Sequence, residues 1–242
     1  IKILKKLVAL QESTKAPGTP GAQRKLGEAM FAASQPAEAA VHLGKAHLAM
    51  RQTKDAAATS VWREWVQALL AADDPAAIGA IASQADKGQR DQALVWMEER
   101  LADLDRKRNF AAILLLTAEA QKGLAGRLSV EQTAQLAEAR QQAVGRQQAD
   151  DIQRVAQAAG KLVGGEEALR KKAQAELQAM GDRAVRPLLG ELLKVLRAEP
   201  VNVPLEKAIV AIVQESAPKL TGYDPAAARD ERVKLIEKWL AE

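Results

Sequence analysis

The chain of 242 residues contains no cysteine, so it forms no disulfide bond and offers no thiolate for catalysis or metal binding. This absence does not identify a compartment, because exported and cytosolic proteins can both lack cysteine. No apolar run reaches the length of about 18 residues that crosses a bilayer. We therefore expect a soluble protein, either cytoplasmic or exported after removal of a leader. The first residue is Ile1 and not Met, which is expected of a processed chain or of a fragment.

Residues suited to catalysis are also scarce. The only histidines, His42 and His47, are five positions apart and so lie about 140° apart around a helix, where they cannot jointly bind a metal. The sequence has no glycine-rich phosphate loop, no nucleophile elbow and no calcium-binding loop. Acidic pairs such as Asp73-Asp74 and Asp150-Asp151 are better explained as helix caps and solvated first turns. We expect no enzymatic activity and no cofactor.

Aromatic residues make up only 3% of the chain, whereas residues that favour helices (Ala, Leu, Glu, Lys, Arg and Gln) dominate it. No alternation of apolar and polar residues continues for more than a few positions, so a sheet is not expected. The net charge is only +4, and basic and acidic residues are mixed through both halves. This mixture is more typical of a solvated surface than of a nucleic-acid-binding face.

The strongest helical pattern lies in Met180–Leu196, where apolar side chains recur with the spacing of one helix face. These side chains are Val185, Leu188, Leu189, Leu192, Leu193 and Leu196. Asp182 is expected to cap this helix, and Pro187 is expected in its first turn. The preceding segment, Glu166–Met180, is predicted to be a second helix. Its apolar face is expected to carry Leu169, Ala173, Leu177 and Met180.

These two segments resemble a HEAT repeat, a pair of antiparallel helices joined by a tight turn. The residues that carry the resemblance are Leu177, Met180, Gly181, Ala184, Val185, Pro187, Leu188 and Leu189. Further on, Asp224-Pro225 is predicted to start the last helix, which carries Arg232 and Trp239 and is similar to the closing unit of some bacterial HEAT-repeat proteins. The resemblance implies that neighbouring helical pairs stack to bury each apolar stripe.

A different repeat is indicated in residues 22–122. The first helix carries Leu26, Gly27 and Met30, and a second begins at Pro36 and carries Ala39, Leu43 and Ala46. The second-helix pattern recurs at Ala77-x-x-x-Ile81 and at Ala111-x-x-x-Leu115-x-x-Ala118, with offsets of 38 and 34 residues. The first helix of the second pair is expected to carry Trp62, Trp65 and Leu69, and that of the third pair Leu94, Met97 and Leu101. This arrangement resembles tetratricopeptide (TPR) repeats, in which small residues allow helices to approach closely.

Two segments flank these repeats. Residues 1–21 comprise a short basic amphipathic stretch, Ile1–Glu12, and a linker, Ser13–Gly21, that is rich in Pro and Gly. At about three turns the stretch is short for membrane contact, so a docking helix or the tail of a longer helix is favoured. Residues 123–165 are expected to be a helical connector that starts at a capping box formed by Ser129 and Gln132. It is either one long helix or two helices broken near Gly145. Residues 166–242 are the HEAT-like region.

Three groups of residues are candidates for contact with a partner. The first comprises Arg51, Trp62, Arg63 and Trp65, which could line a peptide groove, although packing between repeats is the favoured role of the tryptophans. The other two are basic clusters, Arg106, Lys107 and Arg108, and Arg170, Lys171 and Lys172. They could bind an anion or nucleic acid, although solvated faces are the more common explanation for such runs.

We therefore predict an all-α, right-handed α-solenoid of antiparallel helix pairs, TPR-like and then HEAT-like. Its expected function is non-catalytic: protein–protein interaction or scaffolding within a larger assembly. The alternative is nucleic-acid binding along a basic face of the solenoid. A third possibility is an exported module that binds peptides or the cell envelope. The sequence does not identify the partner.

Overall fold

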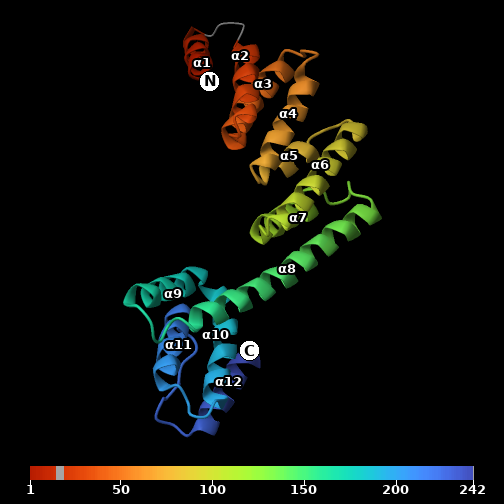
Figure 1. The fold of residues 1–242 in the computed structure, drawn as a ribbon. Helices are drawn as coiled ribbons and strands as arrows, with labels where there is room; N and C mark the ends of the chain where they lie inside the picture. The colour runs from red at the N-terminus through yellow and green to blue at the C-terminus, as the bar shows by residue number, and fades with distance from the viewer. Residues whose placement is uncertain (15–18, 242) are drawn as a thin grey trace. The chain divides into compact units, whose positions relative to one another are not determined.

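The computed structural model describes residues 1–14 and 19–241, which form twelve α-helices and no strand (Figure 1). This confirms the all-α class that the helix-favouring composition predicts. The packed helices are compatible with a helical repeat. By the contacts between its residues the chain divides into two compact units, unit 1 (Ile1–Val144) and unit 2 (Gly145–Glu242). The division falls inside the predicted connector, residues 123–165.

Unit 1 is built from helices that pack on their neighbours in sequence. They are α1 (Lys2–Thr14), α2 (Thr19–Ala32), α3 (Pro36–Gln52), α4 (Ala58–Ala71), α5 (Ala76–Ala82), α6 (Lys87–Arg106), α7 (Phe110–Gly123) and the first half of α8 (Val130–Ala159). Helix α3 packs between α2 and α4, while α4 also contacts α6, and α5 also contacts α7. Contacts between every second helix are those that stacked helical pairs make.

The small residues of the TPR-like pattern allow the close approach that the sequence predicts. A Cβ atom on Gly27 of α2 would lie 2.6 Å from Cγ of Leu43 on α3, so only glycine fits this contact. Leu26, Met30, Ala39, Leu43 and Ala46 are all buried and belong to the core of unit 1. The first predicted pair of helices is therefore present and uses the expected faces.

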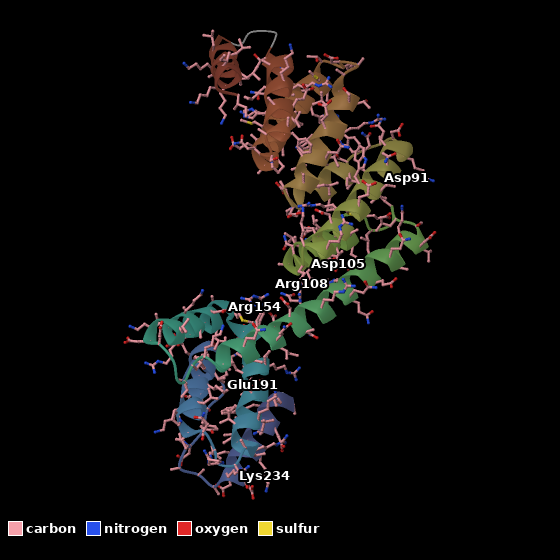
Figure 2. All side chains as sticks on the ribbon, viewed as in Figure 1. Asp91, Asp105, Arg108, Arg154, Glu191 and Lys234 are labelled. Atoms are coloured by element: carbon pink, nitrogen blue, oxygen red, sulfur yellow. The ribbon has the colours of Figure 1, made fainter. Side chains whose placement is uncertain are left out.

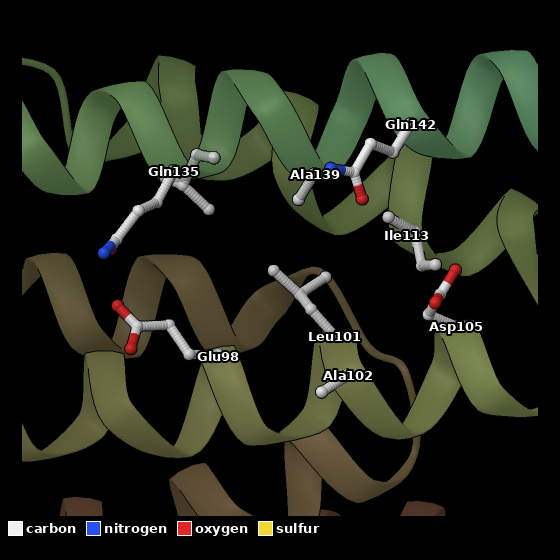
Figure 3. Close-up of a pocket in the computed structure, with 9 residues that line it drawn as sticks. Glu98, Leu101, Ala102, Asp105, Ile113, Gln135, Ala139 and Gln142 are labelled. Carbon is white, nitrogen blue, oxygen red and sulfur yellow. The ribbon is translucent and has the colours of Figure 1, made fainter.

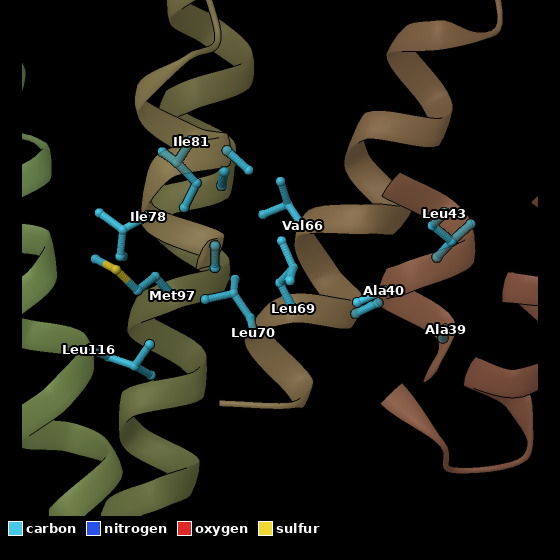
Figure 4. Close-up of a cluster of buried hydrophobic side chains, with 14 of the residues drawn as sticks. Ala39, Ala40, Leu43, Val66, Leu69, Leu70, Ile78, Ile81, Met97 and Leu116 are labelled. Atoms are coloured by element: carbon cyan, nitrogen blue, oxygen red, sulfur yellow. The ribbon is translucent and has the colours of Figure 1, made fainter. Parts of the chain in front are cut away.

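The core of unit 1 runs continuously from helix to helix. Figure 4 shows Val66, Leu69 and Leu70 of α4 between the side chains of α3 on one side and those of α5 and α6 on the other. Leu116 of α7 extends the same cluster. Each helix of this cluster buries its apolar stripe against neighbouring helices and could not bury it alone.

Two predictions for unit 1 are wrong. Leu115 of α7 is 44% exposed, while the next residue, Leu116, is fully buried, so the predicted pattern is one residue out of register. The reason lies at the start of the helix, where Asn109 caps α7 and Phe110 enters the core, which sets the buried face. The predicted linker is also too long, because α1 extends to Thr14 and α2 begins at Thr19. Residues 15–18 lie outside the described part of the chain.

The predicted capping box at the start of α8 is confirmed. The backbone N–H of Gln132 donates to Oγ of Ser129 at 3.1 Å, and the N–H of Ser129 donates to Oε1 of Gln132 at 2.9 Å. Of the two alternatives for the connector, the structure has one helix, Val130–Ala159, without a break at Gly145. This helix gives Leu136 and Ala143 to the core of unit 1 and Val155 and Ala158 to the core of unit 2.

Unit 2 is organised around one strongly amphipathic helix. Besides the second half of α8 it contains α9 (Glu167–Met180), α10 (Asp182–Arg197), α11 (Val203–Ser216) and α12 (Arg229–Ala241). Helix α10 packs against α9, α11 and α12, and its Leu188, Leu189, Leu192 and Leu196 are almost completely buried. The apolar stripe predicted from the sequence is therefore the centre of this unit.

The helix that precedes α10 departs from the predicted HEAT-like pair. In Figure 1, α9 lies across the ends of α10 and α11 and not alongside α10. Its buried residues are Ala173, Leu177 and Met180, whereas Leu169 is 49% exposed, contrary to the prediction. A helix that crosses its neighbours touches them over a short length, so its first turn has nothing to cover it.

Predicted helix starts in unit 2 are wrong at two places. Gly181, with φ of +55°, precedes α10, so Asp182 is its first residue and not a side-chain cap, and Pro187 lies beyond the first turn. The last helix begins at Arg229 and not at Asp224-Pro225. There the carboxylate of Asp224 accepts a hydrogen bond from the N–H of Ala226 at 2.8 Å, which closes a turn ahead of the helix.

Candidate functional site

The two neighbouring tryptophans of α4 contact different helices. Trp62 is 2% exposed and donates its indole N–H to the carbonyl of Ala80 on α5 at 3.2 Å. Trp65 is half-buried and stacks on His47 of α3, with 5.5 Å between ring centroids. Trp62 is therefore a core residue with no surface for a partner, so the two tryptophans do not line a peptide groove together. Packing is thus the role that the structure gives to Trp62.

Arg51 and Arg63, the basic residues of the first candidate group, are exposed. With Trp62 in the core, they do not form a shared aromatic and basic surface with it.

Both histidines have partners within unit 1: Nδ1 of His42 lies 2.6 Å from Oε1 of Gln23, and Nδ1 of His47 lies 3.0 Å from the carbonyl of Ala58. Among the described residues, no group of three or more His, Asp or Glu side chains could hold a metal ion.

The basic cluster Arg106, Lys107 and Arg108 lies at the turn between α6 and α7, as predicted. A carboxylate at its centre takes up much of its charge: Nζ of Lys107 lies 2.8 Å and a guanidinium nitrogen of Arg106 lies 3.5 Å from Asp103. The hydrogen bond from Lys107, with the nearby charges of Arg100 and Arg106, lowers the pKa of Asp103. Figure 2 labels Asp105 and Arg108 at this turn, where the backbone N–H of Arg108 donates to the carbonyl of Asp105 at 3.0 Å.

The second basic cluster, Arg170, Lys171 and Lys172, lies on the exposed face of α9. Nζ of Lys171 lies 2.6 Å from Oε1 of Glu167, one turn earlier on the same helix. Both side chains of this pair are largely exposed, so the pair contributes little to stability. This cluster belongs to unit 2, whereas the cluster of Arg106, Lys107 and Arg108 belongs to unit 1.

The candidate site is a groove in unit 1 with a volume of about 400 Å³. Helix α6 supplies one wall and the first half of α8 the other, and α7 contributes one side chain (Figure 3). We call this feature the α6–α8 groove. Its lining residues are Glu98, Leu101, Ala102, Asp105, Ile113, Gln135, Leu136, Ala139 and Gln142.

The lining residues follow from helix periodicity on both walls. On α6 they are at positions i, i+3, i+4 and i+7, and on α8 at i, i+1, i+4 and i+7, so each set shares one face over two turns. In both sets the polar residues are outermost and apolar residues lie between them. Figure 3 shows Glu98 opposite Gln135, with Leu101 and Ala139 toward the middle of the groove and Ala102 on the α6 wall.

The sequence did not indicate this groove, although each wall has a recognisable pattern. Its two walls are about 40 positions apart in the chain, and nothing local predicts that α8 lies over this face of α6. The only usable signal was the thin apolar face of the connector, in which alanine and glutamine replace the large residues of a close-packed helix. Small residues on one wall leave space between the helices.

A buried charged cluster in unit 2 was also missed. Glu206 of α11 is 1% exposed, and its carboxylate accepts hydrogen bonds from the hydroxyl of Tyr223 and the guanidinium of Arg232. Trp239 packs beside Tyr223, with 6.2 Å between ring centroids. Within residues 1–14 and 19–241, Oε2 of Glu206 and Nε of Arg232 are buried without a hydrogen-bond partner. The cluster joins α11, α12 and the loop between them, so its role is to hold the end of the fold together.

Tyr223 makes this cluster testable, because it is the only tyrosine in the chain. Burial, and then its hydrogen bond to Glu206, raise the pKa of Tyr223 well above the usual value of about 10. The raised pKa means that the neutral phenol stabilises the folded state fully below pH of about 10, and that this contribution is lost as the pH rises further.

We therefore expect tyrosinate absorbance to appear only well above pH 10, together with the loss of helical circular dichroism, in a titration of the full chain. The same chain in denaturant is the control and should titrate near pH 10. A folded chain that ionises its tyrosine near that value, with helicity intact, would show that the buried hydrogen bond is absent.

In the described part of the chain, no helix is both long and apolar enough to cross a membrane. The fold and the groove define a class: an all-helical fold, compatible with a helical repeat, with a surface groove between helices. Comparisons with protein-family models, with curated proteins and with solved structures find no match to this chain.

Proposed function

We propose that the chain is a non-catalytic protein-binding module whose α6–α8 groove holds a segment of a partner protein. The groove is the observation that carries this proposal. Five of its nine lining residues are apolar, and the polar ones lie at its ends. An apolar centre with a polar border is the usual anatomy of a surface that binds a protein segment.

The composition of the groove favours a protein over nucleic acid as partner. It contains no Lys or Arg, whereas a surface that binds phosphates depends on them. The nearest basic cluster, around Lys107, is held by the carboxylate of Asp103. Binding along a basic face is therefore the weaker proposal, and a protein scaffold or subunit of an assembly is the stronger one.

Site-specific photocross-linking in cells that produce the protein tests this function. A photoreactive amino acid at Ala139 faces the groove, and the same amino acid at exposed Ala137 on the same helix is the matched control. We expect one or a few discrete protein adducts from position 139 that are absent from position 137. Equal adducts at both positions, or adducts with nucleic acid alone, would refute the proposal.

A further inference from the structure

The two walls of the α6–α8 groove repeat the same order of residue types along their length. Glu98 on α6 and Gln135 on α8 lie at one end, and the apolar side chains follow over the next turn (Figure 3). Four residues of α-helix separate Glu98 from Ala102, which corresponds to about 6 Å along the axis. A partner segment in this groove therefore meets a carboxylate and an apolar floor about one helical turn apart.

The floor itself is shaped for a large side chain. Leu101 and Leu136 are buried and form this floor, and Figure 3 shows Ala139 of α8 facing Leu101 of α6. Because Ala139 presents only a methyl group, it leaves room over Leu101 that a leucine, methionine or phenylalanine of a partner would fill. Closing this space removes apolar surface from water, which is the main source of affinity in such a contact.

The charge of the groove is of one sign. Two of its lining residues are acidic, Glu98 and Asp105, and none is basic. Asp105 already interacts with another group of the chain, so it is not available to pair with a ligand. Glu98 is exposed, and within residues 1–14 and 19–241 no hydrogen bond or ion pair engages its side chain. It is the carboxylate that a partner can reach.

We propose that the segment bound in the α6–α8 groove is a basic amphipathic helix. A bulky apolar side chain packs on Leu101 beside Ala139, and a lysine or arginine one turn away pairs with Glu98. This inference rests on the proposed function, since it names the chemistry of the partner for the same groove. The apolar side chain supplies affinity, and the exposed charge pair selects basic over acidic segments.

Two model peptides of equal length test this inference on the full chain. Both are amphipathic helices with leucine on one face, and the other face carries lysine in one peptide and glutamate in the other. We expect the leucine–lysine peptide to bind with one-to-one stoichiometry by fluorescence anisotropy, and the leucine–glutamate peptide to bind at least about tenfold more weakly.

Variants of the groove and matched controls then locate the binding. Ala139→Trp fills the floor and should weaken binding of the leucine–lysine peptide more than about tenfold. Glu98→Lys reverses the selecting charge and should weaken it about three- to tenfold. The controls Ala137→Trp and Glu99→Lys change exposed neighbours on the same helices and should have no effect. If Ala139→Trp lowers the helical content, Ala102→Trp narrows the groove from the α6 wall instead.

Equal binding of both peptides, or binding that does not respond to a filled groove, would overturn the inference. If position 139 still captures discrete proteins in cells, the proposed function stands while the partner chemistry is wrong. If it captures none, both fail. Adducts at position 139 between two copies of the chain would replace a basic partner with self-association and would also overturn the inference.

Discussion

Arg232→Met is expected to lower the free energy of unfolding of unit 2 by about 3–5 kcal/mol. The substitution leaves the carboxylate of Glu206, which is 1% exposed, without the guanidinium that compensates its charge. In the intact cluster the hydrogen bond to Glu206 raises the pKa of Arg232, so this arginine is charged at any working pH. Hydrogen exchange of the amides in α10, α11 and α12 measures the loss in this unit alone.

Two further variants separate the buried pair from general effects of substitution. Arg229→Met removes the partner of Glu199, whose side chain is 84% exposed, and should cost at most about 1 kcal/mol. Glu206→Gln added to Arg232→Met removes the stranded charge, so the double variant should be more stable than Arg232→Met alone. An Arg232→Met chain no less stable than Arg229→Met would contradict the role assigned to the cluster.

Leu189→Ala is expected to destabilise unit 2 by about 2–5 kcal/mol. Leu189 is 1% exposed at the centre of the apolar stripe of α10, so its loss leaves a cavity that the surrounding helices close only in part. Limited proteolysis should then cut unit 2 at lower denaturant concentrations than in the unmodified chain, while unit 1 keeps its resistance, because the two units have separate hydrophobic cores.

Leu169→Ala provides the matched control for this experiment. Leu169 is also a leucine in unit 2 but is 49% exposed on α9, so its removal should change stability by no more than about 0.5 kcal/mol. Simultaneous loss of protection in both units after Leu189→Ala would show that the two units unfold as one.

Local signals allowed several features of the fold to be predicted. The cap of α8 was one of them, because it involves only Ser129 and Gln132, three residues apart. The apolar stripe around Leu189 was equally clear, because its residues share one face whatever packs against it. At Asp224-Pro225 the local signal was ambiguous, because an aspartate can cap a helix or close a turn. In the structure the carboxylate of Asp224 closes a turn.

The sequence by itself determined that the chain is helical, where most of its helices lie and which side chains share a face, because these properties depend on backbone propensity and on interactions within about one turn. Only the tertiary structure decided which of those faces are covered. It exposes Leu115 and Leu169, buries Glu206 with an arginine 26 positions away, and brings Glu98 and Ala139 to opposite walls of one groove. Periodicity specifies a face but not the neighbour that covers it, since that neighbour comes from a distant part of the chain.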